Sequence, residues 1–267
     1  MKYFDAHNHF QDARLAQGRS EWMPALEELP IAGAVVNGTR QRDWKAVESF
    51  AAEFPWVTPS FGLHPWYVRS RTEGWLDDLR EHLQRHPAAG IGEIGLDRWI
   101  QDHDIEDQQR VFLPQLRLAA ELNRPATIHC LQAWGALWDI IRSEPASQRG
   151  FLIHAYGGPA EMVGGFAERG AYFSFNAYYL RPRKLSQREV FQHIPLYRLL
   201  VETDAPDMSP PDEQNPRSWK DRKGNSINHP ANIDLAYRAL GELRGLDVET
   251  LAHQVEENYR RLFGSRD

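Results

Sequence analysis

The side chains with the clearest chemistry in this sequence are imidazoles and carboxylates that stand at the ends of short apolar runs. Both groups are ligands for Zn²⁺ and related divalent metals. Side chains alternate between faces along a strand, so His7 and His9 share a face and can reach one ion. A single His-x-His pair is weak evidence, since two histidines also occur in polar turns. The full set predicts a metal site: His7, His9, Glu93, His129, His154 and Asp204.

Residues this far apart in sequence need regular elements to bring them together. Short runs rich in apolar and β-forming residues recur along the chain, and longer segments of helical character follow them. Their starts are 20 to 35 residues apart, which is the length that a strand, a helix and two loops require. The eight runs are 3–7, 32–37, 57–63, 90–96, 125–129, 151–154, 171–175 and 199–203.

Eight strand–helix units in one uninterrupted chain predict an α/β fold, a single (β/α)8 TIM barrel that spans residues 1–267 as one domain. A barrel gathers the C-terminal ends of its strands at one rim, where catalytic residues collect. Glu93, His129, His154 and Asp204 stand at such ends. We therefore expect a distorted, metal-binding C-terminal rim, over which the irregular segment 205–228 lies.

The alternative architecture is a doubly wound open sheet. That fold carries a glycine-rich phosphate-binding turn after its first strand. Here His-Asn-His stands at that position. The sequence therefore favours the barrel, which leaves no open sheet edge that requires a partner, and no obligate protein partner is evident.

Composition limits where the protein works and what it binds. The 31 basic and 37 acidic residues give a net charge of −6, which excludes coating of nucleic acid by bulk charge. The single Cys130 excludes an internal disulfide and indicates a reducing compartment. No run approaches the roughly 18 apolar residues of a membrane span, and MKYFDAHNHF lacks the apolar core of a signal peptide. We expect a cytoplasmic protein with no membrane partner.

Several short segments in fixed order resemble the TatD family of metal-dependent deoxyribonucleases, within the amidohydrolase-like barrels. They are FDAHNH, GLHPW, GEIGLD, IHC, IHAYGG and ETDAP, followed by NHPANI and ENYRRLFG near the C-terminus. The resemblance covers essentially the whole chain. It implies a hydrolase that cleaves DNA phosphodiester bonds, in single strands or at ends, by means of a metal-activated hydroxide.

The resemblance further implies two divalent ions. On the family pattern His7, His9 and Asp204 hold the first, His129 and His154 hold the second, and Glu93 bridges both. Zn, Mn and Mg are the candidate metals, and the imidazole-rich set suits Zn or Mn better than Mg.

The remaining chemical roles follow from that site. Asp204 is the candidate to take or relay the proton of the attacking water. His64, in the turn after the third run, is placed to contact a phosphate oxygen, with a structural loop histidine as its alternative. Asp5 and Glu202 share the strand parity of proposed ligands. They either orient a ligand imidazole or are satisfied inside the barrel.

Local features bear on the substrate. Two basic segments, 181–188 and 217–223, follow the seventh and eighth runs, where barrels frequently bind phosphate. Solvated charge runs are the alternative. Aromatic residues also lie past the strand ends and either stack on unpaired bases or pack within loops: Trp66, Tyr67, Trp99, Tyr156, Tyr178 and Tyr179.

Some positions depart from the family pattern, and they leave other functions open. Leu131 and Gln132 replace an arginine and an acid, Ala155 replaces a cysteine, and His229 replaces a glutamate. These changes spare the six proposed ligands. One alternative is a binuclear metal hydrolase of the same barrel type that acts on an ester, lactone or amide. A second is a non-catalytic metal or nucleic-acid binding module.

Overall fold

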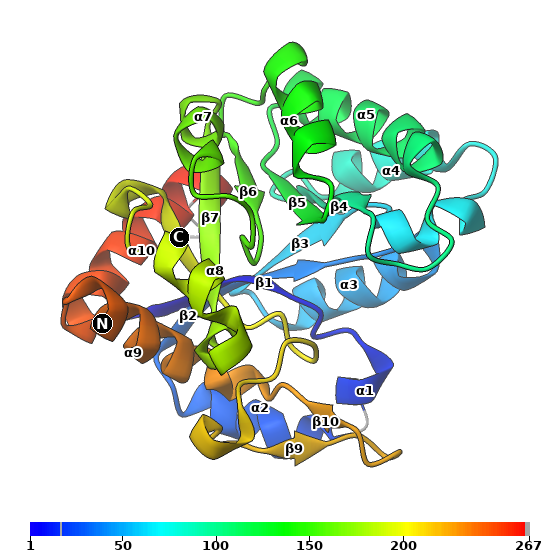
Figure 1. Ribbon diagram of the computed structural model, residues 1–267. Helices are drawn as coiled ribbons and strands as arrows, with labels where there is room; N and C mark the ends of the chain where they lie inside the picture. The colour runs from blue at the N-terminus through cyan, green and yellow to red at the C-terminus, as the bar shows by residue number, and fades with distance from the viewer. Residues whose placement is uncertain (17, 265–267) are drawn as a thin grey trace.

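Parallel strands form the centre of the computed structural model, which describes residues 1–16 and 18–264. They lie in chain order around the barrel, and every hydrogen-bonded neighbour runs parallel. Figure 1 shows the helices arranged around them. The strands are β1 (Tyr3–Asn8), β2 (Ile31–Asn37), β3 (Val57–Phe61), β4 (Gly90–Asp97), β5 (Ala126–Leu131), β6 (Phe151–Ile153), β7 (Ala171–Asn176) and β8 (Leu199–Glu202).

The seam between β8 and β1 is closed just beyond the end of β8. The backbone N–H of Asp204 donates to the His7 carbonyl at 3.0 Å, and the N–H of His9 donates to the Ala205 carbonyl at 2.8 Å. The predicted (β/α)8 barrel is therefore confirmed. The backbone bonds that close this seam involve His7, His9 and Asp204, so the closure of the barrel also positions these three predicted ligands.

Two strands carry register shifts close to proposed ligands. In β1 the pairing shifts between Asp5 and Asn8, and in β4 it shifts between Ile91 and Ile94. Such irregularities re-aim side chains and are common beside active sites. The rim is thus distorted in the two strands that carry His7 and Glu93.

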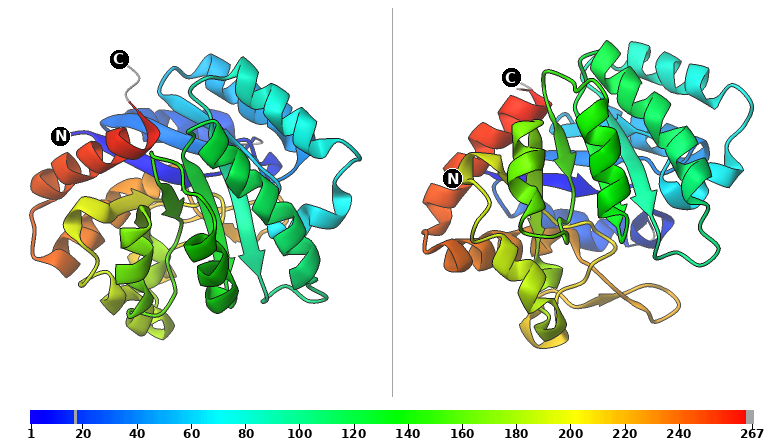
Figure 2. Two further views of the ribbon diagram at one scale, coloured as in Figure 1. Left: turned by 90° about the horizontal axis from the view of Figure 1, so that it is seen from above. Right: turned by 45° about the horizontal axis from the view of Figure 1, so that its top comes forward.

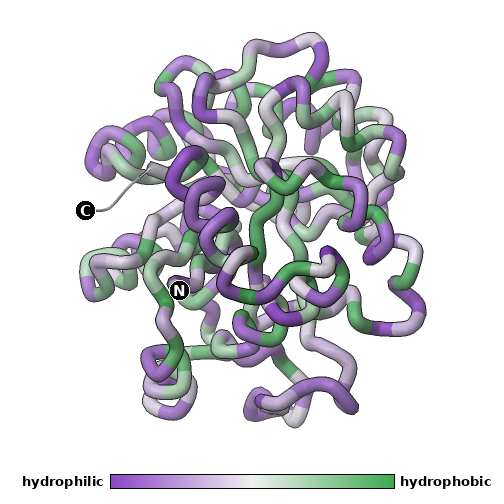
Figure 3. Tube along the Cα trace, turned by 90° about the vertical axis from the view of Figure 1, so that its left-hand side faces the viewer, coloured by the Kyte–Doolittle hydropathy of each residue, from purple (hydrophilic) through white to green (hydrophobic). Residues whose placement is uncertain are grey.

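Helices cover the outside of the barrel because each buries one apolar face and exposes a polar one. Figure 3 shows hydrophilic and hydrophobic residues interleaved along the outer coils. The helices are α1 (Ala13–Ala16), α2 (Arg19–Glu27), α3 (Gln41–Glu53), α4 (Trp75–Arg85), α5 (Ile105–Glu121), α6 (Trp134–Ser143), α7 (Met162–Glu168), α8 (Leu185–Val190), α9 (Ile233–Arg244) and α10 (Val248–Phe263). Within the described ranges, no helix has the length and apolar character needed to cross a membrane.

Shorter 3-10 helices connect several of these elements: η1 (Pro65–Ser70), η2 (Ala177–Leu180), η3 (Pro182–Lys184), η4 (Leu196–Arg198), η5 (Asp212–Gln214) and η6 (Pro230–Asn232). The segment after β8, expected to be irregular, contains an antiparallel hairpin of β9 (Trp219–Lys220) and β10 (Ser226–Ile227). A Cβ placed on Gly18 would lie 2.0 Å from the Trp219 ring. The hairpin therefore packs against the start of α2. Figure 1 shows the hairpin beside α2, and the right-hand view of Figure 2 shows it projecting from the barrel.

Candidate metal centre

Glu93 lies at the centre of the six predicted ligands and is buried. Its Oε2 is 3.5 Å from His7 Nε2 and 3.2 Å from His9 Nε2. Its Oε1 is 3.1 Å from His129 Nδ1 and 2.9 Å from His154 Nε2. The two oxygens of one carboxylate therefore face two separate pairs of imidazoles.

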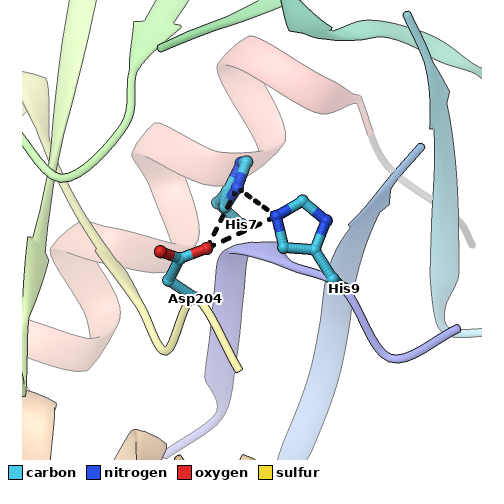
Figure 4. A group of neighbouring side chains, drawn as sticks. All are labelled: His7, His9 and Asp204. Carbon is cyan, nitrogen blue, oxygen red and sulfur yellow. Dashed lines mark hydrogen bonds and ion pairs between the residues drawn. The ribbon is translucent and has the colours of Figure 1, made fainter. Parts of the chain in front are cut away.

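Asp204 completes the first of these groups. Its Oδ1 is 3.4 Å from His7 Nε2 and 3.5 Å from His9 Nε2, and the two Nε2 atoms are 3.3 Å apart. Figure 4 shows the three side chains pointing toward one another from β1, the residue after it, and the segment after β8. Asp204 has a φ of 55°, a left-handed conformation that Asp adopts more readily than most residues. Its backbone bond to His7 holds it there.

The imidazole tautomers decide whether this cluster fits a cation. His9 Nδ1 lies 2.8 Å from the Asn37 carbonyl, which only accepts, so Nδ1 carries the proton and Nε2 offers a lone pair. His129 Nε2 lies 2.8 Å from an Asp97 oxygen, so its Nδ1 faces Glu93 as an acceptor when the ring is neutral. The unprotonated nitrogens of these two rings therefore converge on the Glu93 carboxylate, each with a lone pair directed at it. These imidazole nitrogens and carboxylate oxygens are suitable ligands for divalent metals that accept both kinds of group.

A carboxylate stands behind each imidazole of the second pair. Asp97 accepts from His129, and Glu202 Oε1 lies 3.5 Å from His154 Nδ1. Such partners fix the orientation of a metal-binding histidine. Sequence reasoning assigned no such role to Asp97, although it ends the GEIGLD segment. The signal available was its place at the end of β4, next to β5, which carries His129.

Asp5 and Glu202, the two strand-borne acids, were each expected either to orient a ligand imidazole or to be satisfied inside the barrel, and the structure gives them different partners. Glu202 contacts a ligand imidazole and also accepts from the Ser174 hydroxyl. Asp5 instead accepts from the hydroxyl and backbone N–H of Thr203, at 2.6 and 3.1 Å, and from the backbone N–H of His7 at 3.2 Å. Burial raises the pKa of Asp5 to about 8. Asp5 is thus an internal carboxyl group that joins β1 to β8.

Charges inside the cluster are strongly coupled. Burial alone would lower the pKa of His9, but hydrogen bonds to Asp204 and Glu93 raise it well above its usual value. The pKa of His154 is likewise raised against burial by Glu93 and Glu202. Burial would raise the pKa of Glu93, yet the surrounding imidazoles hold it well below its usual range. The imidazoles and carboxylates of the cluster therefore stabilise each other's charged forms.

His64 differs from His9 and His129 in that it turns its protonated nitrogen toward Glu93. Its Nδ1 accepts from the Trp66 backbone N–H at 3.1 Å, so Nε2 carries the proton and points at Glu93 Oε1, 3.2 Å away. Burial lowers the pKa of His64 to about 4, which keeps the ring neutral near pH 7. The site thus contains one fixed N–H donor among acceptors.

The aromatic residues that the sequence offered for base stacking differ in their exposure. Tyr156 and Tyr179 are buried, and their hydroxyls donate to the carbonyls of Pro159 and Ala155. These two tyrosines pack within loops and offer no face to a substrate. Trp66 and Trp99 are exposed.

Part of the predicted basic rim is used inside the fold. The Arg181 guanidinium donates to the carbonyls of Ser209 and Pro210, and Arg217 pairs with Asp234. Arg183, Lys220, Arg222 and Lys223 are exposed. Phosphate contact by these loops stays a prediction, now confined to the exposed cations.

Comparison with known proteins identifies the family of this chain. The family model described as TatD related DNase matches residues 4–264. The chain belongs to the TatD family. It is 28% identical over 263 residues to the 3'-5' ssDNA/RNA exonuclease TatD of Escherichia fergusonii, with 98% of each chain covered. It is 27% identical to YabD of Bacillus subtilis, an uncharacterized metal-dependent hydrolase, over 97% of this chain and 98% of that protein.

A solved structure shows the same fold. YjjV, a TatD homologue of Escherichia coli, superposes with a TM-score of 0.89 at 24% identity and covers 98% of each chain. Within this TatD barrel, two of the departures from the family pattern lie close in the chain to predicted ligands. Leu131 ends β5 and Ala155 directly follows His154. Neither position is one of the six proposed ligands.

Proposed function

We propose that this TatD-family hydrolase is a metal-dependent deoxyribonuclease that cleaves phosphodiester bonds in single strands or at ends. One divalent ion would be held by His7, His9 and Asp204, and a second by His129 and His154, with Glu93 as the shared ligand. The observation that carries this assignment is the placement of the two Glu93 oxygens, each 2.9 to 3.5 Å from a different pair of imidazoles.

When bound, such a pair of ions polarises a phosphodiester and lowers the pKa of water. The chain's own residues supply the rest. Asp204 directs Oδ1 at His7 and His9, and its Oδ2 is our candidate acceptor for the proton of the attacking water. The Nε2–H of His64, fixed by its bond from the Trp66 N–H, is our candidate donor to a phosphate oxygen.

Three further assignments belong to this proposal. The substrate class rests on the family and on the exonuclease name of the relatives. We propose Zn or Mn as the working metals, with Mg as the less suitable alternative. We also propose one barrel domain over residues 1–267 that acts in the cytoplasm without an obligate protein partner. The free, buried thiol of Cys130 supports a reducing compartment.

One preparation tested on two substrate panels decides between the proposed function and its nearest alternative. Purified protein with Mn, Zn or Mg is given end-labelled single-stranded and duplex oligonucleotides, and separately a set of esters, lactones and amides. We expect release of nucleotides from single strands, suppressed by a chelator. Turnover confined to the ester, lactone or amide panel would support the alternative hydrolase. Binding of metal and DNA without turnover on either panel would support the non-catalytic module.

Metal affinity should rise with pH. A cation displaces the protons that His9, His129 and His154 retain because hydrogen bonds to carboxylates raise their pKa values. As the pH rises through those pKa values, fewer protons compete with the cation for the imidazole nitrogens. We expect up to about tenfold tighter binding per pH unit for each proton displaced. Titration calorimetry at pH 7 in two buffers of different ionisation enthalpy should detect proton release. Equal affinity at pH 6 and 8 would contradict this picture.

Replacing Asp97 with asparagine should weaken metal binding by about 10- to 100-fold. The amide retains the size of the carboxylate but cannot accept from both His129 and Trp66 with full negative charge. Competition with a chelating dye measures the effect. Asp139→Asn, at an exposed position on α6, is the matched control and should bind like the wild type. An unchanged affinity in Asp97→Asn would show that the histidine needs no such support.

A further inference from the structure

Two exposed indoles lie side by side at the rim of the barrel. Trp66 is 41% exposed and Trp99 is 61% exposed, and they follow the adjacent strands β3 and β4. Their ring centroids are 6.3 Å apart, and their planes differ by 28°. Most of a tryptophan side chain is normally buried in a folded protein. This pair instead leaves flat aromatic surface open to a ligand.

The buried carboxylate of Asp97 fixes the position of both residues. Its Oδ2 accepts from the Trp66 indole N–H at 2.8 Å, and its Oδ1 accepts from the Trp99 backbone N–H at 2.6 Å. The same carboxylate accepts from His129 at 2.8 Å. The Trp66 indole and the Trp99 backbone are therefore held in place before any ligand arrives, which reduces the ordering cost of binding.

The pair is continuous with the candidate metal centre. The Trp66 ring centroid lies 5.2 Å from that of His64, with the rings at 89°. His64 Nε2 is in turn 3.2 Å from Glu93. Aromatic surface thus begins one side chain away from the proposed reaction centre. A nucleotide whose phosphate lies at the candidate metal centre would therefore have this aromatic surface beside it.

We infer that Trp66 and Trp99 form a stacking platform for an unpaired nucleobase next to the scissile phosphate. Bases stack on aromatic side chains in proteins that bind single strands, and every base has a face to offer. A base inside a duplex already stacks on its neighbours, so the platform favours single strands and frayed ends. Exposed Arg98, between Asp97 and Trp99 in the chain, adds positive charge for the backbone. The inference rests on the proposed function, because it names the substrate group that this site selects.

Binding without hydrolysis tests the platform. The probes are a labelled thymidine oligonucleotide and an abasic oligomer with the same number of phosphates. Fluorescence anisotropy is measured in EDTA, so no probe is cleaved and electrostatic effects are shared by both. Wild-type protein should bind the thymidine oligomer about tenfold more tightly than the abasic one. Trp99→Ala should bind both with the weaker affinity, and Trp99→Phe should retain part of the preference.

Tyr197→Ala is the matched control, because Tyr197 is 55% exposed in η4, which precedes β8 at the opposite end of the barrel. That variant should keep the full preference, and thermal denaturation should show that Trp99→Ala is folded. A Trp99→Ala protein that keeps the preference, or a wild type without one, overturns the inference. A preserved preference in a protein that never hydrolyses DNA would instead reject the proposed function and leave the platform standing.

Discussion

Replacement of Glu93 by alanine is expected to lower metal-dependent DNA hydrolysis by at least about a thousandfold. The Glu93 carboxylate contacts both imidazole pairs, with Oε2 facing His7 and His9 and Oε1 facing His129 and His154. Without it, neither proposed ion has a shared ligand. Lewis-acid stabilisation of several kcal/mol is then lost, and each 1.36 kcal/mol is a factor of ten in rate. Initial rates on an end-labelled single strand measure the loss.

The fold should survive this substitution. Once the carboxylate is gone, burial lowers the pKa values of the neighbouring imidazoles, and they lose their protons instead of remaining charged without a partner. Glu93→Gln keeps the shape of the side chain and should be nearly as inactive as Glu93→Ala. That result would show that the activity depends on the negative charge of Glu93 and not on its packing. Glu81→Ala, on α4 with a side chain 70% exposed, is the surface control and should match the wild type. Equal hydrolysis by Glu93→Ala and wild type would mean that the nuclease is a contaminant.

The strands were predictable because they are short buried runs rich in apolar and β-forming residues, most of them with a polar residue at or just beyond the C-terminal end. The predicted run 57–63 contains β3, and 199–203 contains β8. Barrel topology then places His129, His154 and Asp204 at one rim without any knowledge of contacts. Strand order and strand ends thus carry most of the information about which donors meet.

Contacts that depend on side-chain direction were not predictable. Asp97 and Asp5 both lie on strands near ligands, but Asp97 reaches His129 whereas Asp5 reaches Thr203. The register shifts in β1 and β4 decide such outcomes, and they leave no periodic signal in the sequence. Burial of Tyr156 and Tyr179 depends in the same way on how the loops fold over the rim.

The hairpin after β8 escaped prediction for a different reason. Its strands are two residues long, too short to show an alternating pattern. Packing of Trp219 against Gly18 defines its position, and this contact joins segments about two hundred residues apart. Local propensity carries no information about a contact of that range.

Replacement of Gly95 by alanine is expected to destabilise the protein by roughly 4 kcal/mol while leaving all six donors in the sequence. Gly95 has a φ of 144°, and a Cβ there would lie 2.0 Å from the His129 carbonyl oxygen. Gly95 pairs with His129 in the β4–β5 ladder, so the backbone that carries a proposed ligand must move. The strained φ costs about 1–3 kcal/mol and the overpacking a similar amount. Denaturant unfolding in EDTA measures the loss without a contribution from metal.

Gly135→Ala is the matched substitution, because an added Cβ in α6 meets nothing within 4 Å. It should stabilise the protein by up to about 1 kcal/mol, since alanine is the better helix former. Metal titration then tests whether the position of the ligands matters when their identities are unchanged. Gly95→Ala should bind metal more weakly than the wild type even where it is fully folded, because His129 has shifted away from Glu93. Wild-type stability and wild-type metal affinity in Gly95→Ala would show that β4 and β5 can separate without cost, and that their close approach does not position the site.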